Sequence, residues 1–279
     1  MGLTADSVRR MRPEASNVVE AGWELPARSE GWIRGFGWYG RRLLHRSFHK
    51  VRVSGAERAF QEGPVIAYAN HASWWDPVAA LTVGRLLFPD RATYAPIEAA
   101  MLRKYPMFGR MGFFGVEKGT RKGAAEFLRA GLGIMHVRDA LLMITPQGRF
   151  ADVRERPVRF EPGLGHLAVR CRSGVLIPMA MEYAFWEEKR PEILLRLGRP
   201  VKVTDFVSKQ LSAADWTELL ESRLEEAQNE LRDLSVQRAA NRFDVLFSGL
   251  DRIHPVYDLW RRARAWVSGD KFAPAHGIK

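Results

Sequence analysis

The stretch PVIAYANHASWWDP, residues 64–77, contains a short apolar run that stops abruptly at a polar turn. Residues 65–70 are almost entirely apolar, which is typical of a buried strand in a parallel sheet. His71 and Asp76 follow, and Pro77 favours the first turn of a helix, where proline is tolerated. The sequence therefore predicts a strand, a turn and a helix, with a histidine and an aspartate where the strand ends.

The rest of the chain repeats this alternation of strand and helix. Strands are expected at residues 51–55, 92–96, 140–145, 175–182 and 192–201. Helices are expected at residues 76–88, 97–104, 121–137, 163–172 and 213–236, the last capped by Ser212 with Asp215 in its first turn. The alternation predicts an α/β fold, a single domain with a mixed, mostly parallel sheet flanked by helices.

Three regions of the chain are expected. Residues 1–50 are predicted to form a polar leader and a basic, aromatic helix, residues 51–235 the α/β domain, and residues 236–279 a basic, aromatic helical tail. Both ends combine Arg with Trp, as in WIRGFGWYGRRLLHR (32–46) and WRRARAW (260–266). That composition suits a helix in a lipid headgroup layer, but it also suits a basic helix that packs its aromatic side chains on the core. Nucleic acid is a third option, without a recognisable binding motif.

Composition limits the class of protein. The 279 residues are 46% hydrophobic, enough for a sizeable core, and the formal net charge of +11 favours polyanionic partners such as anionic lipid or phosphorylated substrates. The single cysteine, Cys171, excludes an internal disulfide and favours a reducing compartment; a small core residue is a simpler interpretation than a catalytic thiol. Because no window of about 18–20 apolar residues exists, no transmembrane span is expected.

His71 and Asp76 have the chemistry of a general-base pair. Residues five apart on one helix lie about 140° around its axis, so the two side chains meet only if His71 precedes the helix and Asp76 opens it. Asp76 would then hold one imidazole nitrogen and leave the other free to take a proton from a hydroxyl. Ser73 lacks the G-x-S-x-G context of a nucleophile, and the remaining histidines form no metal-binding cluster.

Two other polar stretches follow predicted strands, GVEKGTRKG (115–123) and TPQGRF (145–150). In open α/β sheets, ligands bind beyond the carboxyl ends of the strands. The coincidence of three such stretches therefore favours a site at that edge.

These residues resemble the glycerolipid and lysophospholipid acyltransferases, the 1-acylglycerol-3-phosphate acyltransferase-like family. NHASWWD (70–76) resembles the N-H-x-x-x-x-D block, RMGFFGVEKGTRKG (110–123) the second block, TPQGRF (145–150) the third and VLIPMAM (175–181) the fourth. The blocks occur in family order over residues 50–200. The resemblance implies transfer of an acyl group from a thioester to a lipid hydroxyl, with His71 as base and Asp76 as its orienting partner.

The resemblance also implies the remaining site residues. Substrate binding is expected from Glu117, Lys118, Arg121, Gln147, Gly148 and Arg149. Pro146 and Pro178 are expected to support the site or its oxyanion hole, and backbone amides near Gly148 are candidate oxyanion donors. The implied co-substrate is acyl-CoA or acyl carrier protein, without metal or other cofactor. Membrane lipids are the expected partners, and the expected location is the cytoplasmic face of a membrane, as a peripheral protein.

Some positions depart from the family pattern. Gln147 stands where the third block usually has glutamate, Arg149 where it has threonine and Phe150 where it has arginine; Glu117 and Lys118 occupy the part of the second block where an arginine commonly meets the acceptor phosphate. A phosphate held in another geometry stays possible, as does an acceptor that is not a phosphate monoester, such as a larger lysophospholipid, a glycolipid or a glycosylated isoprenoid. A non-catalytic, lipid-binding relative is the alternative function.

Overall fold

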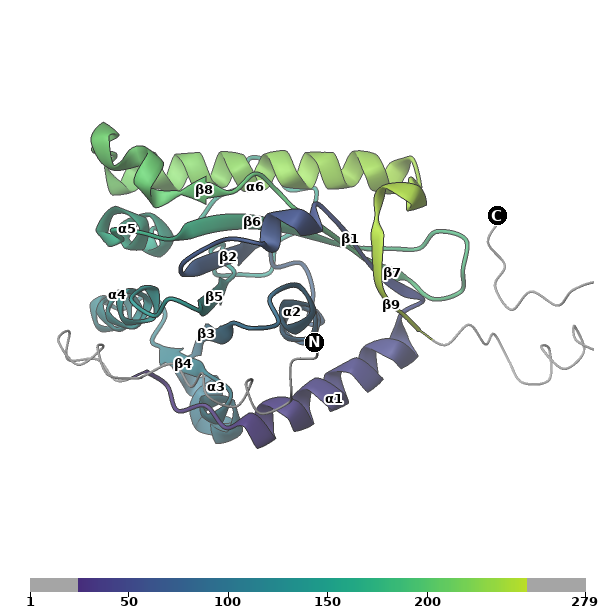
Figure 1. Cartoon of the computed structure of the whole chain (residues 1–279), viewed down its shortest axis with the longest axis horizontal. Helices are drawn as coiled ribbons and strands as arrows, with labels where there is room; N and C mark the ends of the chain where they lie inside the picture. The colour runs from purple at the N-terminus through teal and green to yellow at the C-terminus, as the bar shows by residue number, and fades with distance from the viewer. Residues whose placement is uncertain (1–24, 250–279) are drawn as a thin grey trace, which may run out of the picture.

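The computed structural model describes residues 25–249, which form an α/β fold (Figure 1). The helices are α1 (Glu30–Ser47), α2 (Asp76–Leu87), α3 (Ala99–Lys104), α4 (Arg121–Met135), α5 (Gly163–Arg170) and α6 (Ala213–Val236). The strands are β1 (Lys50–Ser54), β2 (Val65–Ala69), β3 (Ala92–Glu98), β4 (Phe113–Val116), β5 (Ala140–Ile144), β6 (Val175–Ala184), β7 (Glu192–Leu197), β8 (Val201–Lys202) and β9 (Asp244–Ser248). Short 3-10 helices η3 (Ala56–Ala59), η4 (Pro106–Arg110), η5 (Val203–Lys209) and η6 (Ala240–Arg242) complete the described elements.

Within residues 25–249, the strands form one mixed sheet in the order β4-β3-β5-β2-β6-β7-β1-β9, with β8 paired to β6. The half from β4 to β6 is parallel, and β6 pairs antiparallel with β7. The parallel half places the ends of β2, β4 and β5 at one edge of the sheet. Strands β2 and β5 were predicted from the sequence, whereas β4 was not.

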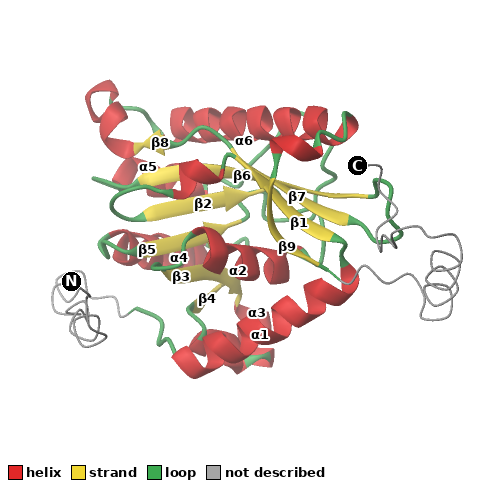
Figure 2. Cartoon of the chain, turned by 45° about the vertical axis from the view of Figure 1, so that its right-hand side comes forward, coloured by secondary structure: helices red, strands yellow, loops and turns green. Residues whose placement is uncertain are grey.

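Two hydrophobic clusters cover the two faces of the sheet. Residues 65, 67 and 69 of β2 pack with α1 and α2, whereas Ile66 and Tyr68 pack with α4, α5 and α6. In Figures 1 and 2, α6 lies along one side of the molecule and α1 along the opposite side. Because side chains alternate along a strand, His71 continues the α1 and α2 face.

Helix α1 docks on α2 through a narrow contact. A Cβ atom on Gly40 would lie 3.1 Å from Thr82 Oγ1, so the lack of a side chain at Gly40 permits a close approach of the two helices. Gly40 and Leu44 are the buried residues of α1, and Phe36 packs on Phe108 of η4, whereas Trp32, Trp38 and Tyr39 are exposed on the outer face. Phe48, which caps the helix, packs edge-on against Trp75 at a ring-centroid distance of 5.0 Å. The C-terminal end of α1 therefore packs against the turn that precedes α2.

The structure differs from the sequence predictions at three strands. Strand β4 forms within the Gly-rich segment 107–119, for which no strand was predicted. Residues 244–248 belong to the region expected to be helical but form β9, which pairs antiparallel with β1 and covers the edge of the sheet. The strand expected at 192–201 is divided into β7 and β8, because Gly198 approaches Pro178 and Ala227 too closely for a side chain and Pro200 lacks an amide donor. Helix α6 has the predicted cap, with Ser212 and Asp215 in a reciprocal capping box. The predictions for residues 1–24 and 250–279 lie outside the described residues.

Candidate active site

The loops that follow β2, β4 and β5 meet at one end of the sheet. The backbone amide of His71 donates to Gln147 Oε1 at 3.2 Å, and Ala151 N donates to the His71 carbonyl at 2.8 Å. From the loop after β4, Lys118 Nζ donates to the Gly148 carbonyl. The three stretches that the sequence analysis singled out thus form one cluster, fixed mainly by backbone groups.

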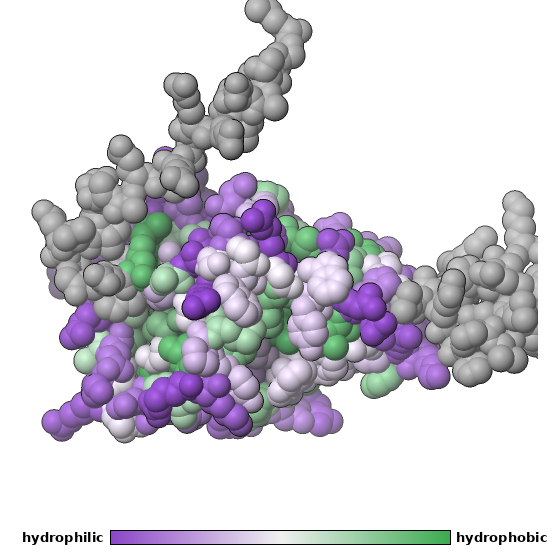
Figure 3. Space-filling model, turned by 90° about the horizontal axis from the view of Figure 1, so that it is seen from below, coloured by the Kyte–Doolittle hydropathy of each residue, from purple (hydrophilic) through white to green (hydrophobic). Residues whose placement is uncertain are grey.

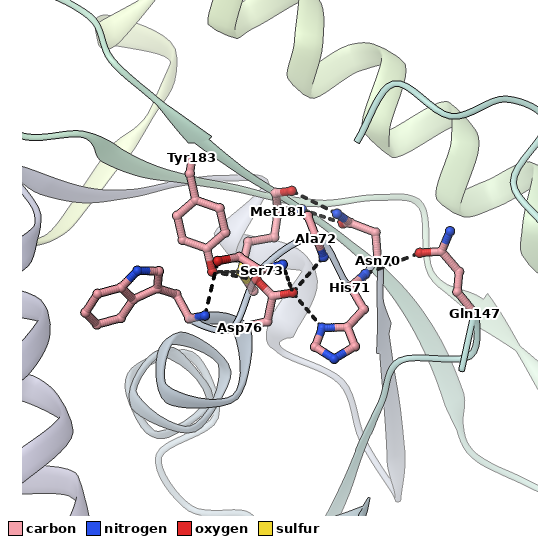
Figure 4. Close-up of polar contacts among 9 residues, drawn as sticks. Asn70, His71, Ala72, Ser73, Asp76, Gln147, Met181 and Tyr183 are labelled. Carbon is pink, nitrogen blue, oxygen red and sulfur yellow. Dashed lines mark hydrogen bonds and ion pairs between the residues drawn. The ribbon is translucent and has the colours of Figure 1, made fainter. Parts of the chain in front are cut away.

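His71 and Asp76 form a hydrogen-bonded pair (Figure 4). His71 lies in the turn before α2, Asp76 is the first residue of that helix, and His71 Nδ1 is 2.7 Å from Asp76 Oδ2. A carboxylate only accepts hydrogen bonds, so Nδ1 carries the hydrogen and the neutral ring keeps its lone pair on Nε2. No described residue donates to Nε2, and the side chain is 20% exposed, so this nitrogen is available to a substrate hydroxyl.

The Asp76 carboxylate is buried but well satisfied. Its Oδ2 also accepts the backbone amides of Ala72 at 2.7 Å and Ser73 at 2.9 Å, and its position at the start of α2 is favourable for a negative charge. Its Oδ1 accepts the hydroxyl of Tyr183 at 2.6 Å. A buried charge is tolerated when it accepts this many donors. Asp76 is therefore held in one orientation toward His71.

Two residues near the pair were missed by the sequence analysis. Tyr183 lies on β6, beyond the fourth block. Asn70 joins β2 to the same strand, because its Nδ2 donates to the Met181 carbonyl at 2.9 Å and its Oδ1 accepts the Met181 backbone amide at 2.8 Å. The alternation of β6 places residues 179, 181 and 183 on one face, and Met179 is paired with Ala69. That register, had it been known, would have indicated Tyr183.

Phe150 is a third residue without a predicted role. Its ring lies 4.3 Å from the His71 ring, centroid to centroid, although 60% of the phenylalanine is exposed. A single exposed apolar ring is common on protein surfaces, so it is the contact with the imidazole that relates Phe150 to the site. Phe150 therefore forms one wall of the approach to the imidazole.

Gln147 and Pro146 shape the loop after β5. Gln147 is buried, and its side-chain oxygen holds the backbone of His71 rather than facing solvent. The Pro146 carbonyl accepts the Glu161 amide at 2.8 Å, which ties the loop to the segment before α5. Both residues position the turn around His71, and neither has a described contact with the imidazole nitrogens.

Gly148 has a backbone conformation that suits glycine. Its φ is +63°, and a Cβ atom would lie 2.9 Å from Glu161 Cγ. Its amide already donates to the Thr145 carbonyl at 3.1 Å, closing the turn. In this arrangement the hydrogen of the Gly148 amide is engaged within the turn, and the role of backbone amides near Gly148 as oxyanion donors stays a prediction.

The expected substrate-binding charges are partly neutralised. The Arg149 guanidinium pairs with Glu155, which raises the pKa of Arg149, and the Glu117 carboxylate lies 3.9 Å from Lys122 Nζ. Lys118 contacts the loop after β5, as described above. Arg121 opens α4 with an exposed side chain and has no ion pair within residues 25–249. Lys118 and Arg121 are thus the cations with capacity left for an anionic group.

Pro178 does not reach the site. It lies in β6 opposite Tyr68, where its ring packs beneath Gly198 and α6, on the face away from His71. Its carbonyl accepts the Gly198 amide at 2.8 Å, and its missing amide hydrogen falls where β6 changes its partner from β8 to β7. Pro178 therefore supports the sheet rather than the reacting groups.

The thiol of Cys171 and the hydroxyl of Ser73 are not placed as nucleophiles. Cys171 is buried at the end of α5, and burial raises the pKa of its thiol to about 12. Ser73 Oγ accepts the Trp75 amide at 3.2 Å and so shapes the turn before α2. Within residues 25–249, no group of three or more metal-ligating side chains occurs.

The fold and the hydrogen-bonded His71–Asp76 pair at the strand ends agree with the arrangement that the sequence blocks predicted. Residues 50–182 match the family model described as Acyltransferase. Residues 50–182 are therefore identified as an acyltransferase-family domain.

A solved structure has the same fold. The crystal structure of the 1-acyl-sn-glycerophosphate (LPA) acyltransferase PlsC from Thermotoga maritima matches with a TM-score of 0.51 and 17% sequence identity, covering 72% of this chain and 79% of that chain. At this identity the match concerns the fold, which confirms the predicted single α/β domain with a mixed sheet. No curated protein matches the sequence.

Proposed function

We propose that this protein transfers a fatty acyl group from a thioester, acyl-CoA or acyl carrier protein, to the hydroxyl of a lipid acceptor. The observation that supports this most directly is the His71–Asp76 pair, with Nδ1 held and Nε2 open to solvent. His71 Nε2 takes the proton of the acceptor hydroxyl as the oxygen attacks the thioester carbonyl. The tetrahedral intermediate then expels the thiolate, which takes the proton back from the imidazolium, so no covalent enzyme intermediate is needed.

The proposed acceptor is a lysophospholipid such as 1-acylglycerol-3-phosphate, or a glycolipid or glycosylated isoprenoid. Lys118 and Arg121 support an anionic headgroup beside the start of α4, where a helix N-terminus also favours a phosphate. Phe150 supports an acceptor with an apolar or ring-shaped part next to the reacting hydroxyl. Both features fit a lipid with a polar head and an acyl or prenyl chain.

We place the reaction at the cytoplasmic face of a membrane, with α1 as the contacting element. The outer face of α1 exposes Trp38 and Tyr39 along with several arginines, a composition that suits the headgroup layer. Figure 3, which looks onto this side, shows strongly hydrophilic side chains set among pale and green ones. No helix among residues 25–249 has both the length and the apolar run required to cross a bilayer.

Helix α6, on the opposite side of the molecule, carries more acidic than basic side chains, although Glu221 is paired with Arg159 and Glu230 with Arg196. A cleft between residues 157–159 and α6 is lined by acidic side chains, namely Glu218, Glu221, Glu225, Glu226, Glu230 and Asp233. An anionic membrane attracts the α1 side and repels the α6 side, so the charge distribution supports one orientation of docking.

The membrane contact is tested by sedimentation with anionic vesicles. Replacing Arg41, Arg42 and Arg46 by Glu is expected to release the protein, because each basic residue near the surface contributes about 1 kcal/mol of binding. The matched control replaces three exposed lysines and arginines on the α5 and α6 side, Arg172, Lys202 and Lys209, by Glu. Equal binding of both variants would contradict α1 as the docking element.

The reaction is tested by thiol release from a long-chain acyl-CoA with purified protein. The acceptors are lysophosphatidic acid, other lysophospholipids and a neutral glycolipid, each compared with His71→Ala and repeated with an acyl carrier protein donor. Release that depends on both acceptor and His71 supports the acyltransferase and identifies the acceptor class. Lipid binding without turnover for every donor and acceptor would instead favour a non-catalytic, lipid-binding relative.

A further inference from the structure

Tyr183 of β6 donates a hydrogen bond to Asp76, and Tyr183 belongs to none of the four sequence blocks. We propose that Tyr183 is a positioning residue, which holds the Asp76 carboxylate in the plane that orients His71 and limits how strongly Asp76 stabilises the imidazolium. The inference rests on the proposed role of His71 as the general base. It adds a residue from a strand 107 positions away to the pair.

The two oxygens of Asp76 have different partners. Oδ2 accepts His71 Nδ1, Ala72 N and Ser73 N at 2.7, 2.7 and 2.9 Å, whereas for Oδ1 the partner within the described chain is the Tyr183 hydroxyl at 2.6 Å. A carboxylate with donors on one oxygen alone can rotate about its Cβ–Cγ bond and lose alignment with Nδ1. The Tyr183 hydroxyl opposes that rotation because it fixes the second oxygen from the other side.

Tyr183 is itself held rigidly. Two residues before it, Met181 is joined by both backbone groups to the Asn70 side chain. The Tyr183 ring packs on Phe48 with a ring-centroid distance of 5.7 Å. Phe48 packs in turn on Trp75, next to Asp76, with a ring-centroid distance of 5.0 Å. Burial and the neighbouring Asp76 carboxylate raise the pKa of the Tyr183 hydroxyl, so it stays protonated and acts as a permanent donor.

The hydroxyl also affects the charge that His71 experiences. A hydrogen bond to Oδ1 draws electron density away from Oδ2, so Asp76 stabilises the imidazolium less than a carboxylate without that bond. Without the hydroxyl, the protonated ring is favoured and the free base forms only at higher pH. On the acid limb of the pH–rate profile, activity is lost because the base becomes protonated. The midpoint of this limb should therefore move to higher pH.

The other charged groups around the pair have no described hydrogen bond to the Tyr183 hydroxyl. Lys118 contacts the Gly148 carbonyl and Glu117 lies near Lys122, both from the loop after β4 and the start of α4. In the loop after β5, Arg149 is paired with Glu155, and Glu161 lies against Gly148. The end of α1 contributes the apolar Phe48. A change in the pH dependence of Tyr183→Phe is therefore attributable to the hydroxyl.

Tyr183→Phe tests the proposal, with Tyr68→Phe as the matched control. Tyr68 is also buried, lies three residues before His71, and has no hydrogen-bond partner for its hydroxyl in the described part of the chain. We expect Tyr183→Phe to lower kcat about tenfold. We also expect it to raise the midpoint of the acid limb by about half a pH unit. KM for the acceptor and the melting temperature should change little, and Tyr68→Phe should leave the profile unchanged.

A second measurement does not depend on turnover. The ring nitrogens of His71 are followed by ¹⁵N NMR as the pH is varied, in the wild-type protein and in Tyr183→Phe without substrate. An upward shift of the titration midpoint in Tyr183→Phe supports the positioning role even if every acceptor fails. An unchanged midpoint and an unchanged acid limb would overturn it, leaving Tyr183 with a packing role. Absence of wild-type turnover contradicts the proposed function, not the Tyr183 contact.

Discussion

Two histidine–carboxylate pairs lie against the same sheet, and they differ in what else they contact. His71 Nδ1 is 2.7 Å from Asp76 Oδ2 at the end of β2, whereas His49 Nε2 is 3.8 Å from Glu192 Oε1 where β1 and β7 begin. The Glu192 carboxylate is already paired with Arg52, and the Trp186 ring covers that guanidinium. The His71 ring is 20% exposed, compared with 6% for His49.

The difference shows that a histidine near a carboxylate does not by itself make a catalytic site. In the Glu192 cluster the charges satisfy one another inside the protein, so the cluster stabilises the contact between β1 and β7. In the Asp76 cluster, backbone amides and Tyr183 satisfy the carboxylate, and one nitrogen of the imidazole stays accessible. A general base needs an accessible nitrogen without a hydrogen-bond partner, whereas a buried polar cluster is stable when its groups are hydrogen-bonded to one another.

The strongest test of this comparison removes each imidazole in turn. His71→Ala is expected to lower acyl transfer about 1,000-fold, because the general base is lost, with little change in the melting temperature. His49→Ala is expected to show the reverse, with lower stability and normal turnover per folded molecule. Rates and melting curves of the two variants give the answer. Similar rate losses in both would remove the distinction between the two pairs.

Removing the charge of Glu192 tests the structural cluster. Glu192→Gln leaves Arg52 buried without its partner, and we expect a loss of about 3 kcal/mol in the free energy of unfolding. Urea denaturation measures the loss, and kcat of the remaining folded protein should equal that of the wild type. A variant as stable as the wild type would show that the buried ion pair makes no net contribution.

Asp76→Asn tests the orienting carboxylate with almost no change in size. An amide cannot stabilise the imidazolium as a carboxylate does, and its NH₂ group favours the wrong tautomer of His71, so we expect a loss of about 100-fold in kcat. Circular dichroism should show an intact fold. A fully active Asp76→Asn would refute the orienting role.

Phe150→Ala is expected to give the smallest of these effects. Removing the ring opens the His71 imidazole to water, so acceptor-independent hydrolysis of acyl-CoA should become faster. Acyl transfer should become slower, with a free-energy barrier higher by about 1 kcal/mol. Phe185 is exposed to a similar degree and has no described ring contact with His71, which makes Phe185→Ala the control. An unchanged ratio of hydrolysis to transfer in Phe150→Ala would show that the ring does not exclude water.

Much of the fold followed from the periodicity of the chain. The run 65–70, Pro77 and the cap at Ser212 are local signals, and the structure has β2, α2 and α6 where they were expected. Strand β9 was missed because it follows a long helix and its pairing with β1 depends on residues nearly 200 positions away in sequence. Edge strands of this kind have little periodicity of their own.

The sequence by itself determined the His71–Asp76 pair and the positions of the loops after β2 and β5. A strand, a short turn and a helix begun by Asp76 bring these two side chains together by local geometry alone. Only the tertiary structure decided that Tyr183 reaches Asp76, that Gln147 holds the His71 backbone, and that Phe150 covers the imidazole. Those contacts depend on the order and register of β2, β5 and β6, which join residues about 75–110 positions apart, and no local pattern specifies such pairings.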